Sequence, residues 1–350
     1  MATMEAVQFS FTERNLALNK VPIPEVRNPL DVLIKVAYAG ICGTDLHILA
    51  GEYPCRQMGA ITLGHEISGT VVEVGSDVVH FRKEDKVAID PNSGCKRCTF
   101  CHAGKPHFCK LGCGTNTIGI FKDGGWAQYV LCPEEQVHKL PQNLTLEQAV
   151  LAEPLSCIAH GWDITSPLIV GEKILLLGAG ITGALWACVL HLQGHRTVVV
   201  SEPNTTRLEM MRKLNTNYKM VTPEQLKKNA QKDPEWYSFD VVIDCSGDVG
   251  AIEQGFSLMN SGGKLVVYGV APPANKISIS PYDIFRKEIT IVGVRTNPYT
   301  FKKALDLIAS LGSRYLSHTA LGVKPFLLSE YQEAIDTLKK GTIMKAVFRM

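Results

Sequence analysis

The densest set of potential metal ligands in this sequence is a group of four cysteines between residues 95 and 109. In "GCKRCTFCHAGKPHFC", two, two and seven residues separate Cys95, Cys98, Cys101 and Cys109. Thiolates at this density can close a tetrahedron around one zinc ion and leave no position for a substrate, which is typical of a structural site. Cysteines at this spacing also hold iron–sulfur clusters, which carry single electrons. The spacing therefore predicts a metal site with two alternative occupants.

A second set of potential ligands is scattered along the chain. It comprises Cys42 in "GICGTDLH", His65 and Glu66 in "GHE", and Glu153 and Cys157 in "LAEPLSC". Mixed sulfur, nitrogen and carboxylate ligands with one open position are what a catalytic zinc requires. Each residue also has an ordinary structural alternative, such as a buried thiol, a hydrogen-bonded core histidine or a carboxylate at a helix start. The residue types alone leave these alternatives open.

A glycine-rich turn, "GAGITG", follows an apolar strand-like run and opens an apolar helix-like run. Gly178, Gly180 and Gly183 have the G-x-G-x-x-G spacing, and Ile181 and Thr182 lie between the last two glycines. Glycine is needed where the turn is tight and where the backbone approaches a pyrophosphate at the helix N-terminus. This context predicts a dinucleotide-binding site.

An acidic residue ends the next strand-like run, as the same motif requires. Glu202 in "VVVSEPN" lies 24 positions beyond Gly178, where its carboxylate can accept hydrogen bonds from ribose hydroxyls and repel a 2'-phosphate. The sequence therefore favours NAD over NADP, although Arg207 lies close enough to weaken the preference. A surface glutamate at a helix start is the alternative. A nicotinamide cofactor carries hydride rather than single electrons. We therefore predict that the four cysteines bind zinc rather than an iron–sulfur cluster.

The elements that must position these residues show two patterns. From residue 30 to about 140, short β-rich runs broken by glycine and proline predict a compact, mostly antiparallel β domain. From about 170, strand-like runs alternate with helix-length spacers and predict a doubly wound parallel sheet. The six runs are 173–177, 197–201, 218–221, 240–244, 264–269 and 289–293. Two amphipathic helices at 298–311 and 329–341 and a last strand at 344–350 are expected to follow.

Length and composition limit the class of protein. A chain of 350 residues should form about two domains, and a net charge of +2 gives no electrostatic reason to expect nucleic acid or a membrane as a partner. The apolar stretch 174–192 has three glycines in its first half, so we expect a buried strand, turn and helix there. Eleven cysteines without a secretory signal indicate reduced thiols and bound metal, and we expect a cytoplasmic protein.

In their order and separation, these motifs resemble the zinc-containing medium-chain dehydrogenase/reductase family over essentially the whole chain. The motifs are "GICGTDLH", "LGHEISGTVVEVG", the four-cysteine lobe, "DGGWAQYV", "LAEPLSC", "GAGITG" and "GGKLVVYG". The resemblance implies an α/β protein with a GroES-like catalytic domain and a Rossmann domain that binds NAD. The catalytic domain would comprise residues 1–154 and 298–350, with a structural zinc lobe at 95–109, and the Rossmann domain residues 155–297.

The resemblance also implies roles at a catalytic zinc. Cys42, His65 and Glu66 would be its ligands, and Glu153 would either bind the zinc directly or hold its water. Asp45 would orient the His65 ring from the side away from the metal, and this contact fixes the ring tautomer. With the four-cysteine lobe, two zinc ions per chain are expected.

Proton transfer is the last implied role. Thr44 and His47 match the proton relay of the family, which would carry the proton of a substrate hydroxyl to solvent while hydride passes to the nicotinamide. Five other cysteines have no role that the residues support, and we expect buried thiols at Cys55, Cys113, Cys132, Cys188 and Cys245.

Within the family, "GHE" with "EPLSC" is closest to the sorbitol-type and arabinitol-type polyol dehydrogenases and to threonine dehydrogenase. Sorbitol-type enzymes usually carry a tyrosine where this chain has Ile48, whereas Arg295 in "GVRTNPY" is retained, so both positions are candidate substrate contacts. We expect reversible oxidation of a secondary alcohol or polyol. The alternatives are L-threonine 3-dehydrogenase or a butanediol-type enzyme. The resemblance favours a homotetramer, with a dimer as the smaller alternative.

Overall fold

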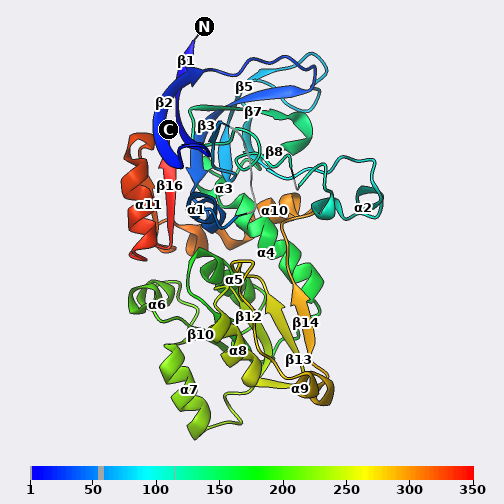
Figure 1. The fold of residues 1–350 in the computed structure, drawn as a ribbon, viewed down its shortest axis with the longest axis vertical. Coiled ribbons are helices and arrows are strands. Elements are labelled where there is room, and N and C mark those ends of the chain that lie inside the picture. Colours follow the sequence, from blue (N-terminus) through cyan, green and yellow to red (C-terminus); the bar gives the residue numbers. More distant parts are fainter. Residues whose placement is uncertain (1, 54–58, 114) are drawn as a thin grey trace.

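The structure is a computed structural model that describes residues 2–53, 59–113 and 115–350, and its strands form three sheets (Figure 1). A parallel sheet with its helices forms the lower half of the molecule in Figure 1, and two mainly antiparallel sheets form the upper half. The α/β fold with a β-rich part and a doubly wound part is therefore confirmed. Cys55, which was expected to be a buried thiol, lies outside the described residues.

The six predicted runs form one parallel sheet, in the order β11, β10, β9, β12, β13, β14. The strands are β9 (Ile174–Leu177), β10 (Val198–Ser201), β11 (Lys219–Val221), β12 (Phe239–Asp244), β13 (Met259–Val267) and β14 (Thr290–Gly293). The start of β13 lies five residues before the predicted run. The order reverses direction at β9, and ligands of such sheets bind beyond the carboxyl ends of the strands at this point.

Helices cover both faces of this sheet because its strands are apolar on both faces. Ile174 and Leu176 of β9 pack with helix α5 on one face, whereas Leu175 and Leu177 pack with helix α8 on the other. The helices of this half are α5 (Ile181–Leu192), α6 (Thr205–Arg212), α7 (Pro223–Lys232), α8 (Val249–Ser257) and α9 (Pro281–Lys287). The apolar stretch 174–192 is β9, a turn and α5, as predicted.

The β-rich half contains a seven-stranded and a three-stranded sheet. The larger has the order β15, β16, β3, β5, β6, β8, with β7 paired to β3, and only its β15–β16 pair is parallel. Its strands are β3 (Asp31–Gly40), β5 (Ile67–Val74), β6 (Lys86–Ile89), β7 (Tyr129–Pro133), β8 (Val137–Lys139), β15 (Val323–Phe326) and β16 (Lys345–Arg349). The smaller sheet comprises β1 (Thr3–Ser10), β2 (Asn15–Pro22) and β4 (Ala60–Thr62), and its β1–β2 hairpin was not among the expected elements.

Helices α4 (Ala152–Thr165) and α10 (Phe301–Leu316) lie between the two halves (Figure 1). Helix α4 contains the expected boundary between residues 154 and 155, and α10 packs against it. The other helical segments are α1 (Gly43–Ala50), α2 (Thr99–His102), η1 (Pro106–Phe108), η2 (Glu134–Gln136), α3 (Leu146–Ala149), η3 (Leu328–Glu330) and α11 (Tyr331–Lys339). Helix α10 continues beyond its predicted end through a kink at Gly312, where φ is +57°.

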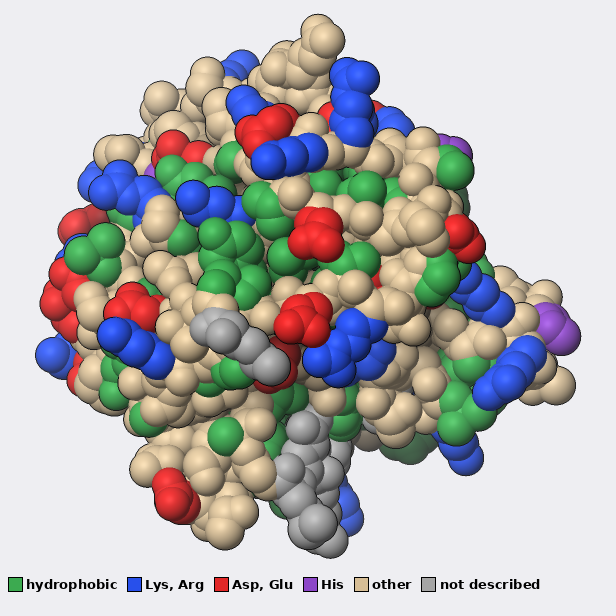
Figure 2. All heavy atoms as spheres, turned by 90° about the horizontal axis from the view of Figure 1, so that it is seen from above, with side chains coloured by type: hydrophobic (Ala, Val, Ile, Leu, Met, Phe, Trp, Pro, Cys, Tyr) green, Lys and Arg blue, Asp and Glu red, His purple; other side chains and the backbone are tan. Residues whose placement is uncertain are grey.

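Charged side chains of both signs are interspersed over the face of the β-rich half that Figure 2 shows, in line with a net charge of +2. Within the described residues, every helix is too short or too polar to span a lipid bilayer.

Candidate active site

The stretch "GICGTDLH" runs from the end of β3 into helix α1, and Cys42 is the residue that precedes the helix. The carboxylate of Asp45 accepts a hydrogen bond from the backbone N–H of Cys42 at 2.8 Å, which fixes the first turn. The Cys42 backbone is extended and the next residues are helical, so the thiol lies at the start of the helix.

Two further side chains from a distant loop converge on Cys42. Its sulfur, a ring nitrogen of His65 and a carboxylate oxygen of Glu66 all lie within 4.8 Å of one another. The Nδ1 atom of His65 faces Oδ1 of buried Asp45 at 3.5 Å, so Nε2 is the nitrogen left to bind a metal. One thiolate, one imidazole and one carboxylate form a set that suits zinc with a further position open to substrate.

A lysine from the C-terminal strand balances the charge of Glu66. The ammonium group of Lys345 forms an ion pair with Glu66 and donates a hydrogen bond to the carbonyl of Ile41 at 3.2 Å. Both charged side chains are only 1% exposed. Gly40 leaves the room that this pair needs, because a Cβ atom there would collide with the Glu66 carboxylate. The sequence analysis missed Lys345, since a lysine in a terminal strand carries no signal of its own.

Helix α4 brings Glu153 and Cys157 to the same region, one turn apart on one face. The thiol of Cys157 donates to Oε1 of Glu153 at 3.5 Å. Burial raises the pKa of Glu153 to about 7, and nearby His65 opposes this shift while Glu66 adds to it. Glu153 is not part of the compact three-residue set, so its carboxylate lies beside that set.

A cavity of about 460 Å³, here called the reaction cavity, opens beside these residues and is also lined by Thr44 and His47. The Nδ1 atom of His47 forms a hydrogen bond with Oε2 of Glu52 at 2.7 Å. With 28% of its side chain exposed, His47 connects the cavity to solvent, as the end of a proton relay must. The sequence analysis missed Glu52, although it lies only five residues after His47.

The two residues expected to contact substrate lie in different surroundings. Ile48 is buried in the hydrophobic core and does not line the reaction cavity. Successive residues of a helix point about 100° apart, so a helix that turns His47 toward the cavity turns Ile48 into the core. Arg295 is exposed and lines the cavity, and its guanidinium lies 5.9 Å from the centre of the Phe108 ring.

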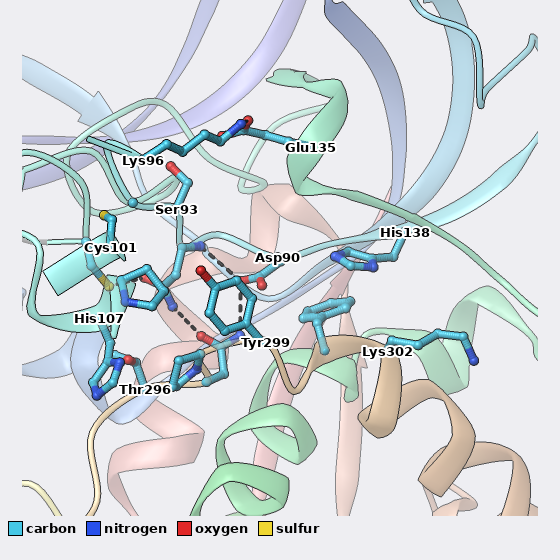
Figure 3. A pocket seen from close by; sticks show the side chains of 17 residues that line it. Asp90, Ser93, Lys96, Cys101, His107, Glu135, His138, Thr296, Tyr299 and Lys302 are labelled. Carbon is cyan, nitrogen blue, oxygen red and sulfur yellow. Dashed lines mark hydrogen bonds and ion pairs between the residues drawn. The ribbon is translucent and has the colours of Figure 1, made fainter. Parts of the chain in front are cut away.

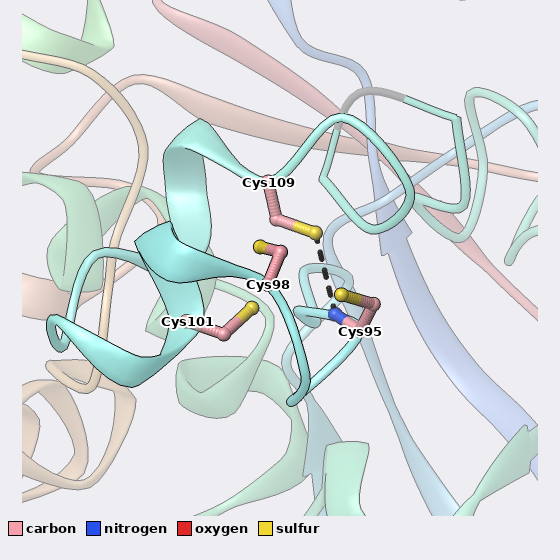
Figure 4. Close-up of side chains that lie close together, drawn as sticks. All are labelled: Cys95, Cys98, Cys101 and Cys109. Carbon is pink, nitrogen blue, oxygen red and sulfur yellow. Dashed lines mark hydrogen bonds between the residues drawn. The ribbon is translucent and has the colours of Figure 1, made fainter.

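The four cysteines of the lobe converge as their spacing predicts. The ligand atoms of Cys95, Cys98, Cys101 and Cys109 lie within 4.8 Å of one another, and their sulfurs point toward a common centre in Figure 4. The backbone N–H of Cys95 donates to the Cys109 sulfur at 3.4 Å. Although burial opposes it, this donor and the N–H of Leu111 lower the pKa of Cys109 to about 6. The lobe thus offers four sulfur atoms that could bind a single metal ion.

The glycine-rich turn lies between β9 and α5 and has the geometry of a phosphate cradle. Gly178 has a φ of +99°, in the left-handed region that favours glycine, and a Cβ atom on Gly183 would collide with the carbonyl oxygen of Gly178. At Gly180, which precedes α5, an added Cβ would meet no protein atom within 4 Å. The space above Gly180 is therefore open for a pyrophosphate at the helix N-terminus.

Glu202 lies at the carboxyl end of β10, next to this turn. Its carboxylate accepts hydrogen bonds from the backbone N–H groups of Ala179 at 2.7 Å and Asn204 at 2.9 Å. Each carboxylate oxygen has a second lone pair that can accept a ribose hydroxyl. Glu202 and Arg207 line a cavity of about 950 Å³ with Gly178 and Gly180, here called the nucleotide cavity.

The nucleotide cavity and the reaction cavity share Cys245 and Ser246, which follow β12. Buried Asp244 shapes this junction, because its carboxylate accepts hydrogen bonds from the N–H groups of Ser246 and Gly247 at 2.9 and 3.1 Å. Tyr268 lines the reaction cavity from the end of β13. The sequence analysis assigned no role to these residues, and their position at the carboxyl ends of two strands was the available signal.

The residues present fit the groups that the motifs predict. One cluster offers sulfur, nitrogen and oxygen beside a cavity, and the other offers four sulfurs in a closed lobe. An open cradle above Gly180 and a carboxylate at Glu202 suit an adenine dinucleotide. The shared wall at Cys245 and Ser246 places the metal cluster and the nucleotide site on one continuous surface.

Two family models match the chain. Residues 28–142 match the alcohol dehydrogenase GroES-like domain, and residues 182–310 match the zinc-binding dehydrogenase model. The first contains Cys42, His65, Glu66 and the four-cysteine lobe, and the second contains Gly183, Glu202 and Arg207.

Similar proteins cover nearly the whole chain. D-arabinitol dehydrogenase 1 of Uromyces fabae is 32% identical over 336 residues, which are 95% of this chain and 93% of that protein. L-threonine 3-dehydrogenase of Chelativorans sp. (strain BNC1) is 34% identical over 349 residues, 98% of each chain. The crystal structure of a protein described as a zinc-binding dehydrogenase of Sinorhizobium meliloti 1021, bound to NADP, has a TM-score of 0.89 and 32% identity over 100% of both chains.

Proposed function

The chain belongs to the zinc-containing medium-chain dehydrogenase family, and from this premise we propose that it transfers a hydride between NAD and a secondary alcohol or polyol, reversibly. The observation that carries the proposal is the convergence of Cys42, His65 and Glu66 on the reaction cavity, which shares Cys245 and Ser246 with the nucleotide cavity. Such continuity allows one substrate carbon to lie between a metal ion and a nicotinamide.

The proposed cofactors are one NAD and two zinc ions per chain, one held by the reaction-cavity cluster and one by the cysteine lobe. When bound, zinc makes a substrate hydroxyl more acidic, and NAD accepts the hydride. The side chains that would hold the catalytic ion are Cys42, His65 and Glu66. Asp45 keeps the proton of His65 on Nδ1, so that Nε2 presents its lone pair. Glu153, whose pKa burial raises to about 7, can hold a proton beside the substrate near neutral pH.

The proposed proton exit runs through Thr44 and His47. Both line the reaction cavity, and Thr44 has a hydroxyl that can donate and accept at once. His47 receives the proton on its cavity side, while Glu52 stabilises the resulting imidazolium through its hydrogen bond to Nδ1 at 2.7 Å. Partial exposure of His47 then lets the proton pass to solvent.

A preference for NAD over NADP is proposed to depend on Glu202. Replacing Glu202 with glutamine keeps the shape of the side chain and removes its charge, so a 2'-phosphate is no longer repelled while Arg207 stays in place. We expect the NAD/NADP ratio of kcat/KM to fall by about tenfold or more, since hydrogen bonds to a charged group contribute about 1.5–3 kcal/mol. Steady-state kinetics with both cofactors measures the ratio.

The matched control for this cofactor change is Glu209→Gln, an exposed carboxylate on helix α6 that does not line the nucleotide cavity. It should leave the ratio unchanged. An unchanged ratio in Glu202→Gln would refute the assigned role of that carboxylate.

The proposed reaction is tested by a substrate panel. Zinc-loaded protein is assayed with xylitol, arabinitol, sorbitol, 2,3-butanediol and L-threonine, each with NAD and NADP, and the nicotinamide absorbance is followed. We expect turnover of at least one polyol or diol with NAD. Turnover of threonine alone would assign the chain to L-threonine 3-dehydrogenase, which the 34% identity to such an enzyme makes the second candidate. No turnover of any secondary alcohol would refute the proposal.

We further propose a cytoplasmic homotetramer, with a dimer as the smaller alternative. Strand β14 is an outer strand of the parallel sheet, with Ile291 exposed on it and Tyr282 and Phe285 exposed on neighbouring α9. An unpaired strand edge beside apolar side chains can pair with a second copy. The cysteines recorded in the described residues are free thiols, which suits a reducing compartment.

A further inference from the structure

A third cavity, of about 570 Å³, lies beside the cysteine lobe and has no part in the proposed reaction (Figure 3). Most of its lining residues come from the segments 90–94, 135–138 and 296–302, and the others come from the lobe and its neighbour Cys113. Asn92, Cys113 and Thr296 line both this cavity and the reaction cavity. These three residues therefore form a wall between the two, and we call the third cavity the lobe cavity.

Hydrogen bonds hold this wall in one arrangement. The side-chain nitrogen of Asn92 donates to Oδ1 of Asn297 at 2.7 Å, and the Asn92 oxygen accepts from Cys113 at 3.0 Å. Asn297 in turn donates to Oδ1 of Asp90 at 3.0 Å. A cavity bounded by a fixed polar network keeps its shape without a ligand, which is typical of preformed binding sites.

The segment at the wall is also strained. Thr296 and Tyr299 have φ values of +52° and +59°, in the left-handed region that branched and bulky residues avoid. Such backbone conformations persist only where surrounding contacts impose them, and they cluster at ligand-binding sites. Asn297, 1% exposed and hydrogen-bonded as described, supplies those contacts between the two strained residues.

Polar atoms around the lobe cavity lack partners. Nδ1 of His107 and Oγ1 of Thr296 are buried and have no hydrogen-bond partner among the described residues. Both hydrogen bonds recorded to the Asp90 side chain end on Oδ1, which leaves Oδ2 free to accept within the described part of the chain. Buried polar groups are rarely left unpaired, because each costs stability. A ligand with hydroxyl groups would satisfy these atoms, because each hydroxyl can both donate and accept a hydrogen bond.

The positive groups around the lobe cavity do not favour an anionic ligand. Lys96 and Lys302 at its rim are already ion-paired, with Glu135 and Asp306. Burial lowers the pKa of His138 to about 4, so this ring is uncharged near neutral pH. Lys96, Lys302 and His138 therefore offer no unpaired positive charge to an anionic group.

Aromatic rings supply the apolar surface of the cavity. His138 is stacked on Phe301 with 4.6 Å between ring centroids, and Tyr299 lies in front of Asp90 in Figure 3. Flat rings beside hydrogen-bonding groups suit a molecule with C–H bonds on one face and hydroxyls at its edge.

We propose that the lobe cavity is a second, non-catalytic binding site for a small neutral polyhydroxylated molecule. Its hydroxyls pair with Asp90, His107 and Thr296, and its C–H face lies against the rings of His138 and Tyr299. The proposal does not depend on the reaction assigned above, since none of the metal ligands lines this cavity apart from Cys101, whose sulfur belongs to the lobe.

The site is tested by isothermal titration calorimetry of zinc-loaded protein with xylitol as the probe and without nucleotide. The Cys42→Ser variant, in which the catalytic metal cluster is disrupted, should bind one xylitol per chain with the wild-type Kd. Ser93→Leu, which fills the lobe cavity, and Asp90→Asn, which removes an acceptor, should each raise that Kd by about tenfold or more. Ser93 lines the lobe cavity and not the reaction cavity.

Exposed Ser76, which lines neither cavity, provides the matched control: Ser76→Leu should leave the Kd unchanged. Loss of xylitol binding in Cys42→Ser, with full binding in Ser93→Leu and Asp90→Asn, would overturn the proposal, because only the reaction cavity would then bind polyols. Binding of inorganic phosphate but not xylitol would overturn the assignment of a neutral ligand. If Cys42→Ser does not fold, xylitol binding by Ser93→Leu and Asp90→Asn, each made in the otherwise unchanged chain, tests the proposal without it. Failure of the substrate panel would not affect this outcome, because binding here needs no turnover.

Discussion

Replacing Cys42 with serine should lower kcat for every alcohol substrate by about a thousandfold or more and reduce bound zinc from two ions per chain to one. A metal that stabilises developing charge contributes several kcal/mol, and about 4 kcal/mol corresponds to a thousandfold in rate. Serine keeps the size of the side chain but offers an oxygen that stays protonated near neutral pH. Of the compact cluster, only His65 and Glu66 remain as ligands.

The measurement combines steady-state kinetics with metal analysis of the dialysed protein. Zinc that remains should belong to the lobe, whose ligands are Cys95, Cys98, Cys101 and Cys109. Cys132→Ser is the matched control, because this thiol is buried in the β-rich core, away from both clusters. It should retain both ions and wild-type turnover. Two ions and full turnover in Cys42→Ser would show that Cys42 is not a ligand.

Replacing Lys345 with methionine should lower the free energy of unfolding by about 3–5 kcal/mol, the cost of leaving a buried charge without its partner. Lys345 and Glu66 are each 1% exposed, so water cannot solvate the remaining carboxylate. A methionine side chain has a volume similar to that of lysine. The loss of unfolding free energy can therefore be assigned to the missing positive charge. Denaturant unfolding of protein from which zinc has been removed measures the effect, because no metal ion then balances the Glu66 carboxylate.

Two further variants identify the cause of this loss. Lys324 lies on the adjacent strand β15, and Lys324→Met removes an exposed ion pair with Glu333 of helix α11, which should cost less than about 1 kcal/mol. Adding Glu66→Gln to Lys345→Met removes the unpaired charge and should recover part of the stability, while the catalytic zinc is held more weakly. Equal losses in Lys345→Met and Lys324→Met would contradict a buried ion pair at the metal cluster.

The strands of the parallel sheet were predictable because their signal is local. Most residues in each of the six runs are apolar, as is expected of strands in a sheet covered on both faces, and all six runs lie in one sheet. The start of β13 was misplaced, since the glycines and polar residues of Met259–Val267 conceal its first half. The β1–β2 hairpin was not predicted, because its second strand is largely exposed and lacks a continuous apolar run.

The sequence by itself determined the sites whose groups lie within a few residues of one another. The four-cysteine lobe and the glycine turn are short segments, so spacing alone restricts where their atoms can meet. Tertiary structure decided the rest of the active site. Cys42 meets His65 and Glu66 only because β3 and β5 pair, and Lys345 reaches Glu66 only because β16 returns beside β3. The spacing of residues along the chain does not predict these contacts, since they result from packing between segments far apart in sequence.

The eight residues of "GICGTDLH" illustrate this division. The family resemblance implied a metal ligand and a proton relay in this one stretch, and the structure puts Cys42, Thr44 and His47 on one cavity. The direction of each side chain was decided by helix α1, which turns Ile48 into the core. The partners of the stretch, His65 from one loop and Lys345 from the last strand beside Glu66, became visible only when the chain was folded, because burial of apolar surface fixes which distant segments share a core.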